Sequence, residues 1–195
     1  MAPARFSSSN SNRGFSLIEV VISMGLLTTV CLGVAQLFAV STHANRVARD
    51  QTSTSAMAEQ KMEQIRSLTW GFDLQGLGLP VTDTTTNLAV YPHQANGPGL
   101  NPSPSDSLEQ NTQFYVDYLD ATGAYVGTGA DVPGEAAFVR RWSITPLPTN
   151  PNNTIVIRVL VSPVSNENAR RVSAQARRRM PGDALLTSVK TRKAS

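Results

Sequence analysis

The stretch that decides the fold is Phe15–Val40, FSLIEVVISMGLLTTVCLGVAQLFAV. It has 26 residues and one charged side chain, that of Glu19. As a helix rising ~1.5 Å per residue it would be ~39 Å long, against ~30 Å for the hydrocarbon core of a bilayer. It is much longer than the ~7–15 apolar residues of an ordinary secretory signal, and no clear cleavage site follows it. We therefore expect residues 15–40 to be a retained transmembrane helix.

The residues in front of this helix have a different character. Residues 1–14, MAPARFSSSNSNRG, are rich in Ser and Asn and carry Arg5 and Arg13 without any acidic residue. A short, polar, positively charged stretch before an apolar helix is typical of a cytoplasmic leader. We expect residues 1–14 to be a leader peptide and not part of the folded structure.

Glu19 is unusual in a membrane helix, because a carboxylate there costs a few kcal/mol and is usually paired or functional. Taken alone, it could equally lie near enough to the helix end to reach the headgroups. The residues around it decide between the two. The run Arg13-Gly14-Phe15-Ser16-Leu17-Ile18-Glu19, followed by an apolar helix, resembles the type IV prepilin signature. That family includes major pilins, minor pilins and type II secretion pseudopilins.

The resemblance implies specific roles for three residues. A membrane-embedded prepilin peptidase would cut after Gly14 on the cytoplasmic side and then N-methylate Phe15. Glu19 would neutralise the new N-terminus of Phe15 on a neighbouring subunit, which agrees with the high cost of leaving a buried charge unpaired. The implied partners are the peptidase, other pilin or pseudopilin subunits, an inner-membrane assembly platform and the lipid bilayer.

A row of small residues runs along the same helix. Gly25, Thr29 and Gly33 are spaced by four, so they share one face. Such rows let membrane helices approach one another closely, although Gly is also simply frequent in membrane helices. We predict that this row packs against neighbouring helices.

The helix is expected to continue beyond the membrane. Residues 41–68 contain no Pro or Gly, and Ala58, Met62 and Ile65 fall on one apolar stripe. Lys61 lies near that stripe and breaks the pattern. We predict one helix over Phe15–Leu68, with residues 15–40 in lipid and an amphipathic continuation, 41–69, packed on a sheet. A coiled-coil stalk is the alternative, but the heptad pattern is poor.

Residues 70–195 are predicted to form an exported globular domain rich in β-strands. The strand signals, alternating or β-branched runs bounded by turn residues, lie at 112–119, 124–127, 138–144, 154–161 and 184–189. Arg140 stands inside the alternating run Phe138–Ile144, so we expect it to be paired or at an edge. The fold class is α+β and pilin-like: one long N-terminal helix packed on a small antiparallel sheet.

Two segments of this domain are expected to be irregular. Residues 71–111 are rich in Gly, Pro, Asn, Ser and Thr, and we predict a long loop that shapes the exposed surface. Residues 166–195 carry eight basic residues against Glu167 and Asp183, a net charge of +6. We predict that this basic tail is a solvated charged end. Acidic patches of neighbouring subunits, anionic headgroups or DNA are alternative contacts.

The residues that carry enzymatic chemistry are scarce. Among the 195 residues there is one Cys, Cys31, and only two His, His43 and His93. Gly127-Thr128-Gly129 is not followed by a third Gly at dinucleotide-binding spacing, and no GKS or GKT phosphate loop occurs. The spacing of Asp117, Asp120 and Asp131 lacks the dense oxygen cage of a Ca²⁺ loop. We expect no enzyme activity, no cofactor, no metal and no nucleic-acid partner.

The sequence is therefore interpreted as a structural subunit, a minor pilin or pseudopilin of a type IV pilus or related secretion filament. The run Ala58–Arg66, AEQKMEQIR, is similar to minor pilins and smaller pseudopilins, and the paired cysteines of common major pilins are missing. The expected location is the inner membrane, with a cytoplasmic N-terminus and a periplasmic domain, and later the filament. Alternatives are a bitopic membrane protein with a periplasmic binding domain, a tip adhesin or DNA-uptake pilin, and a soluble enzyme with a cleaved signal.

Overall fold

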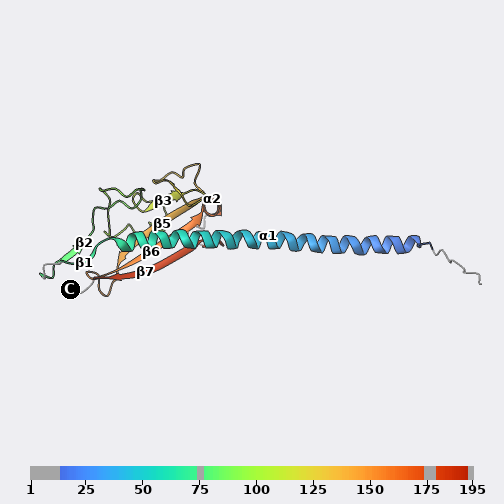
Figure 1. Ribbon diagram of the computed structural model, residues 1–195, viewed down its shortest axis with the longest axis horizontal. Helices are drawn as coiled ribbons and strands as arrows, with labels where there is room; N and C mark the ends of the chain where they lie inside the picture. Colours follow the sequence, from blue (N-terminus) through green and yellow to red (C-terminus); the bar gives the residue numbers. More distant parts are fainter. Residues whose placement is uncertain (1–13, 74–76, 174–178, 193–195) are drawn as a thin grey trace, which may run out of the picture. The chain divides into compact units, whose positions relative to one another are not determined.

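The first element of the chain is a very long helix, α1, Leu17–Ser67, of 51 residues (Figure 1). It is unbroken because residues 17–67 contain no Pro and only two Gly. The predicted helix Phe15–Leu68 is confirmed to within two residues at each end. The computed structural model describes residues 14–73, 77–173 and 179–192, the side chains of 171–173 excepted. It divides into two compact units after Asn45.

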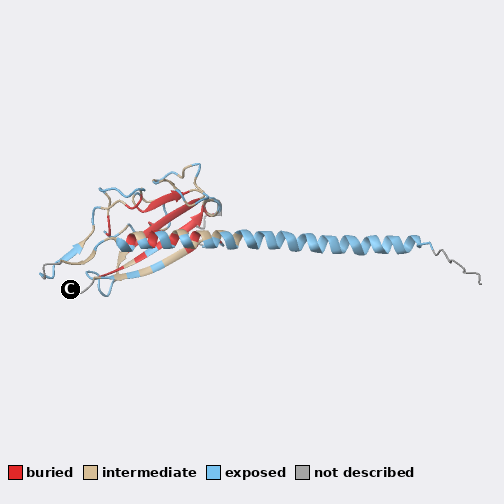
Figure 2. Ribbon diagram, in the orientation of Figure 1, coloured by how far each residue is buried: buried red, intermediate tan, exposed pale blue. Residues whose placement is uncertain are grey.

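The first unit contains the apolar half of α1. Every residue from Gly14 to Asn45 is exposed, and the most apolar 18-residue window of the helix has a mean hydropathy of 2.2 with none of it buried (Figure 2). By length and composition this helix could cross a membrane. A water-soluble surface rarely presents so large a continuous apolar patch. The chain is thus consistent with a single-pass, membrane-anchored protein.

The second unit, residues 46–195, is built around a five-stranded antiparallel sheet of order β4-β3-β5-β6-β7. Its strands are β3 Val116–Leu119, β4 Tyr125–Gly127, β5 Phe138–Pro146, β6 Thr154–Pro163 and β7 Ala184–Thr191. β-Branched and aromatic residues favour these strands because they pack well on a half-buried pleated surface. All five sequence-predicted strands occur, and the α+β fold class is confirmed.

The main core lies between α1 and one face of this sheet. Ala58, Met62 and Ile65 are the buried apolar residues of α1, and they join Trp142 and Ile157 in one cluster. Fully burying a side chain of this size contributes ~1.5–3 kcal/mol, so the second half of α1 is an integral part of this unit. A smaller cluster of Val116, Tyr118 and Val139 packs on the other face.

The prediction of an irregular loop over 71–111 is wrong in part. Strands β1, Trp70–Phe72, and β2, Pro80–Thr82, form a two-stranded antiparallel sheet. Further along, Asn87 and Gln94 form an isolated β-bridge, and the side chains of Leu88 and Leu100 are buried. Burial of a few apolar side chains is therefore sufficient to fold this polar segment onto the domain.

A short helix that the sequence analysis did not predict, α2, Val164–Ser173, follows β6 directly. Its first turn carries Glu167, which is favourable near the positive end of the helix dipole. Polar contacts rather than apolar packing hold α2 in place, as described below.

Candidate functional site

The bond between Gly14 and Phe15 lies in an exposed, non-helical segment. Residues 14–16 precede the helix, and the Phe15 side chain is 83% exposed. The helix begins where the Ser16 carbonyl accepts hydrogen bonds from the backbone N–H groups of Glu19 (3.0 Å) and Val20 (3.2 Å). The peptide bond after Gly14 therefore lies outside the helix.

Glu19 lies in the first turn of α1, four residues after Phe15. Both side chains line a shallow apolar hollow, together with Val20, Ser23, Met24 and Leu27. A carboxylate in the first turn interacts favourably with the positive end of the helix dipole. One helical turn also places it within reach of a charge at the backbone nitrogen of Phe15, on its own chain or a packed neighbour.

Gly25, Thr29 and Gly33 form a smooth strip on the exposed helix. The Thr29 hydroxyl donates a 2.9 Å hydrogen bond to the Gly25 carbonyl, so its donor is satisfied within the helix, as lipid requires. A Cβ built on Gly25 or Gly33 would meet no described atom within 4 Å. Larger side chains therefore fit at both positions in the single chain, and only a neighbouring helix would exclude them.

The second unit contains a buried cluster of three charges that the sequence analysis did not foresee. Lys61 Nζ lies 2.7 Å from Asp117 Oδ2, and Arg140 binds the same carboxylate through Nε at 2.8 Å and NH2 at 2.9 Å. All three residues are at most 4% exposed. Arg140 was predicted to be paired or at an edge, and the structure shows the pairing, on a strand inside the sheet. The only signal in the sequence was two cations at apolar positions, Lys61 in a helix and Arg140 in a strand.

Both cations also make contacts beyond Asp117. Lys61 Nζ donates to the Leu88 carbonyl at 2.7 Å and lies 4.3 Å from the ring centroid of Trp142. Arg140 NH1 donates to the Met57 carbonyl at 3.2 Å. Burial lowers the pKa of Lys61 to about 8, because desolvation outweighs the attraction of Asp117. The cluster of two cations and one carboxylate carries one net positive charge.

A cavity of about 400 Å³ borders this cluster. Lys61, Asp117 and Arg140 contribute to its wall, together with Gln64 and His93. Burial, assisted by the charge of Lys61, lowers the pKa of His93, which favours a neutral imidazole. Both cations in the wall are bound to Asp117.

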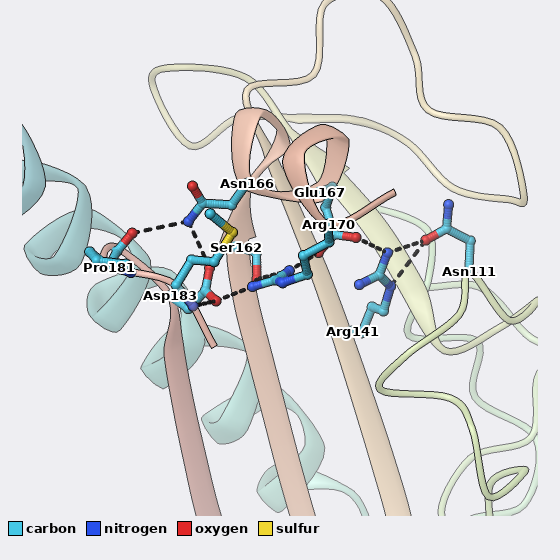
Figure 3. A network of polar contacts seen from close by, with 9 residues as sticks. Asn111, Arg141, Ser162, Asn166, Glu167, Arg170, Pro181 and Asp183 are labelled. Atoms are coloured by element: carbon cyan, nitrogen blue, oxygen red, sulfur yellow. Dashed lines mark hydrogen bonds and ion pairs between the residues drawn. The ribbon is translucent and has the colours of Figure 1, made fainter. Parts of the chain in front are cut away.

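A second polar network holds α2 against the sheet (Figure 3). Glu167 binds Arg141 at 2.9 Å and also binds Arg170, and Arg170 in turn binds Asp183. The charges of the two arginines and the two carboxylates cancel. Buried charges are costly unless they are paired in this way. The network fixes the turn before β7 as well as α2, since Asn166 donates 3.0 Å hydrogen bonds to Pro181 O and Asp183 Oδ1.

The prediction that the basic tail is a solvated end is wrong for three of its residues. Arg170 is buried in the network above. Lys190 Nζ donates to the carbonyls of Arg66 and Leu68 at the end of α1, where a cation is favoured by the helix dipole. Arg192 stacks over the Trp70 ring, 3.7 Å from its centroid. Arg177, Arg178 and Lys193 lie outside the described residues, and Arg171 has no described side chain.

Arg192 also explains how the β1–β2 hairpin is held. Its guanidinium donates hydrogen bonds to the carbonyls of Gly71 (3.0 Å) and Val81 (2.9 Å) and to Thr82 Oγ1 (2.8 Å). One side chain from beyond β7 thus joins both strands of the hairpin.

Among the residues that the structure describes, no group of three or more His, Cys, Asp and Glu side chains could hold a metal ion. Asp117, one of the three aspartates whose spacing was compared with that of a Ca²⁺ loop, is bound by Lys61 and Arg140. The Cys31 thiol is exposed on the apolar half of α1.

Taken together, a single long helix with an apolar exposed half, and an α+β unit built on its second half, define a pilin-like class of architecture. Residues 9–35 match the family model of the prokaryotic N-terminal methylation motif. The chain is therefore type IV prepilin-like, with the motif of a prepilin peptidase substrate and of a structural protein. Neither the curated proteins nor the solved structures gave a match to it.

Proposed function

We propose that this protein is a minor pilin or pseudopilin, a structural subunit of a type IV pilus or related secretion filament. The observation that carries the proposal is the matched motif at residues 9–35, followed without interruption by the exposed apolar half of α1. Before assembly the subunit resides in the inner membrane as a single-pass protein, with residues 1–14 cytoplasmic and the second unit periplasmic.

Processing is proposed to occur between Gly14 and Phe15. The exposed, non-helical backbone of residues 14–16 supports cleavage there, because a peptidase needs a strand-like substrate rather than a closed helical turn. The same enzyme then N-methylates Phe15.

Assembly is proposed to use Glu19 and the row Gly25, Thr29 and Gly33. Cleavage gives Phe15 an ammonium group at the edge of the lipid, where an unpaired charge is costly. Glu19 of a neighbouring subunit compensates it, and the small row allows close helix approach. The partners are other pilin or pseudopilin subunits and an inner-membrane assembly platform.

The test is mass spectrometry of the N-terminal peptide, isolated from membranes of the native host. A peptide that begins at N-methylated Phe15 supports the proposal, and it should disappear when prepilin peptidase is deleted. A mature chain that starts upstream of Gly14, in cells with active peptidase, would favour a bitopic membrane protein. A start beyond Val40 would mean that the apolar helix is a secretory signal.

A further inference from the structure

The second unit has a strongly asymmetric distribution of charge along its length. By sequence, residues 41–55 and 164–183 together hold seven arginines and three acidic residues, a net charge of +4. Residues 56–163 hold five basic and ten acidic residues, a net charge of −5. Residues 184–195 add three basic residues and no acid. The positive charge therefore lies in three stretches, and the first of them directly follows the apolar run Phe15–Val40.

The stretches 41–55 and 164–183 are neighbours in the fold. The buried hydroxyl of Thr54 donates a 2.9 Å hydrogen bond to the Gly182 carbonyl, and a Cβ on Gly182 would lie 3.3 Å from that of Asp50. Asp183 N donates to the Met180 carbonyl at 3.1 Å, which closes a turn. Figure 3 shows Pro181 of this turn beside α1. Arg179 enters this turn three residues before Gly182, and the turn contacts α1 at Asp50 and Thr54, ten and fourteen residues beyond Val40.

Three exposed arginines, Arg46, Arg49 and Arg179, mark this end of the unit, and we call them the basic collar. Two nearby carboxylates are engaged elsewhere, because Asp183 is bound by Arg170 and Glu167 is shared between Arg141 and Arg170. Asp50, beside Gly182, is the acid of this region outside that network. Counted with Asp50, the three arginines of the collar carry a net charge of +2 that can meet an external anion.

The distance along the chain points to the nature of that anion. Arg46 and Arg49 follow Val40 by six and nine residues, ~9 and ~14 Å of helical rise. The apolar run is itself ~9 Å longer than the hydrocarbon core, so its end reaches the headgroup layer. Long arginine side chains extend back toward such a layer, and charges act across a Debye length of ~8 Å at physiological salt.

We propose that the basic collar binds anionic phospholipid headgroups of the leaflet from which α1 emerges. The inference rests on the proposed membrane-stored state. Basic residues close to an anionic membrane each strengthen binding about fivefold, at ~1 kcal/mol per residue. The contact would hold the second unit against the membrane before assembly and release it when the subunit is extracted.

The test uses the full chain, one copy per lipid nanodisc, with and without phosphatidylglycerol in phosphatidylcholine. Both tryptophans, Trp70 and Trp142, belong to the second unit, so energy transfer from them to dansyl-labelled headgroups reports its approach to the membrane. We expect more transfer in the anionic discs and a loss of the difference at high salt. The variant R49Q/R179Q should weaken docking by about 25-fold, whereas R66Q/R158Q, with the same change in charge, should not.

Equal transfer in anionic and neutral discs, or equal effects of the two double variants, would overturn the proposal. An increase that requires two copies per disc would overturn it in favour of contact between subunits. Insertion is measured separately by co-purification with the disc. A chain that fails to insert into either disc would refute the membrane-stored state itself, whereas a chain that inserts but shows no lipid dependence refutes the collar alone.

Discussion

Asp117 is the single anion that compensates two buried cations, Lys61 and Arg140. Removing its charge would leave both cations without a counter-ion in a site from which water is excluded, and such a loss costs ~3–5 kcal/mol. We expect Asp117→Asn to lower the free energy of unfolding by about that amount, measured by urea denaturation of the full chain in detergent. Asp131→Asn, at an exposed position, is the matched control. A loss below ~1 kcal/mol for Asp117→Asn would contradict the description of the cluster.

Lys61 predicts a particular dependence of stability on pH. Its pKa is about 8 in the folded state and 10.5 when unperturbed, so between these values the unfolded chain binds more protons. Stability from this group must therefore rise as pH increases through that window, by roughly 3 kcal/mol in full at ~1.4 kcal/mol per pKa unit. In urea denaturation at pH 7.5, 8.5 and 9.5, the free energy of unfolding of the wild type should rise with pH relative to that of Lys61→Met. Parallel curves for the two proteins would refute the low pKa.

The charged cluster also shows the limit of sequence interpretation for single residues. Lys61 and Arg140 are recognisable as cations at apolar positions, and for Arg140 a pairing could be expected. The identity of the partner could not, because Asp117 becomes opposite to Arg140 only through the antiparallel register of β3 and β5. Residues 120–137 separate these two strands, so no tight turn fixes their register in the sequence.

At the scale of elements, packing of the apolar half of α1 against neighbouring helices can be tested at Gly25. Leucine at position 25 meets no described atom of its own chain, so any defect reports contacts with neighbours. We expect Gly25→Leu to be processed and methylated normally but to be depleted at least tenfold from sheared filaments. Cys31→Leu adds bulk on the opposite side of the helix and should assemble. Equal incorporation of both variants into filaments would contradict the proposal that the row of small residues packs against neighbouring helices.

Arg192 is expected to control the β1–β2 hairpin. Arg192→Met keeps an unbranched side chain but loses three hydrogen bonds to the hairpin, a fourth to the Asn152 carbonyl and the cation–π contact with Trp70. Backbone amides of residues 70–72 and 80–82 should exchange hydrogen at least tenfold faster, because each lost hydrogen bond removes ~0.5–1.5 kcal/mol. Arg158→Met on β6 serves as the control. Unchanged protection of the hairpin would show that it is held by other contacts.

The elements differ in how well their sequences predicted them. Strands β5 and β6 carry long runs of β-branched and aromatic residues, and α1 has helical periodicity without breakers, so local patterns were sufficient. Strands β1 and β2 are three residues each and lie in a Gly- and Pro-rich segment. They form because Arg192, some 110 residues later, donates to them. The processing motif, in contrast, could be recognised from the sequence, because its residues are contiguous.

For the whole molecule, the division after Asn45 predicts that residues 46–195 fold without the apolar half of α1. Every member of the main core cluster belongs to this part. We expect a chain beginning at Arg46 to be soluble and to unfold cooperatively, measured by circular dichroism on heating. A control beginning at Ile65 lacks the buried residues Ala58, Lys61 and Met62 and should be unfolded. Loss of cooperativity in the longer fragment would show that the lipid-facing half contributes to the fold.

The contacts of Lys190 and Gly182 with α1 have a consequence for biogenesis. The helical part of the second unit is synthesised first, yet its partners at both ends come from the segment around β7, more than 120 residues later. Contacts so distant in sequence form slowly, because a long loop must close before they are gained. A nascent chain therefore carries an uncovered apolar stripe on this helical part until the residues around β7 have been synthesised. Interrupting translation within β7 should leave the whole domain unfolded and open to proteolysis.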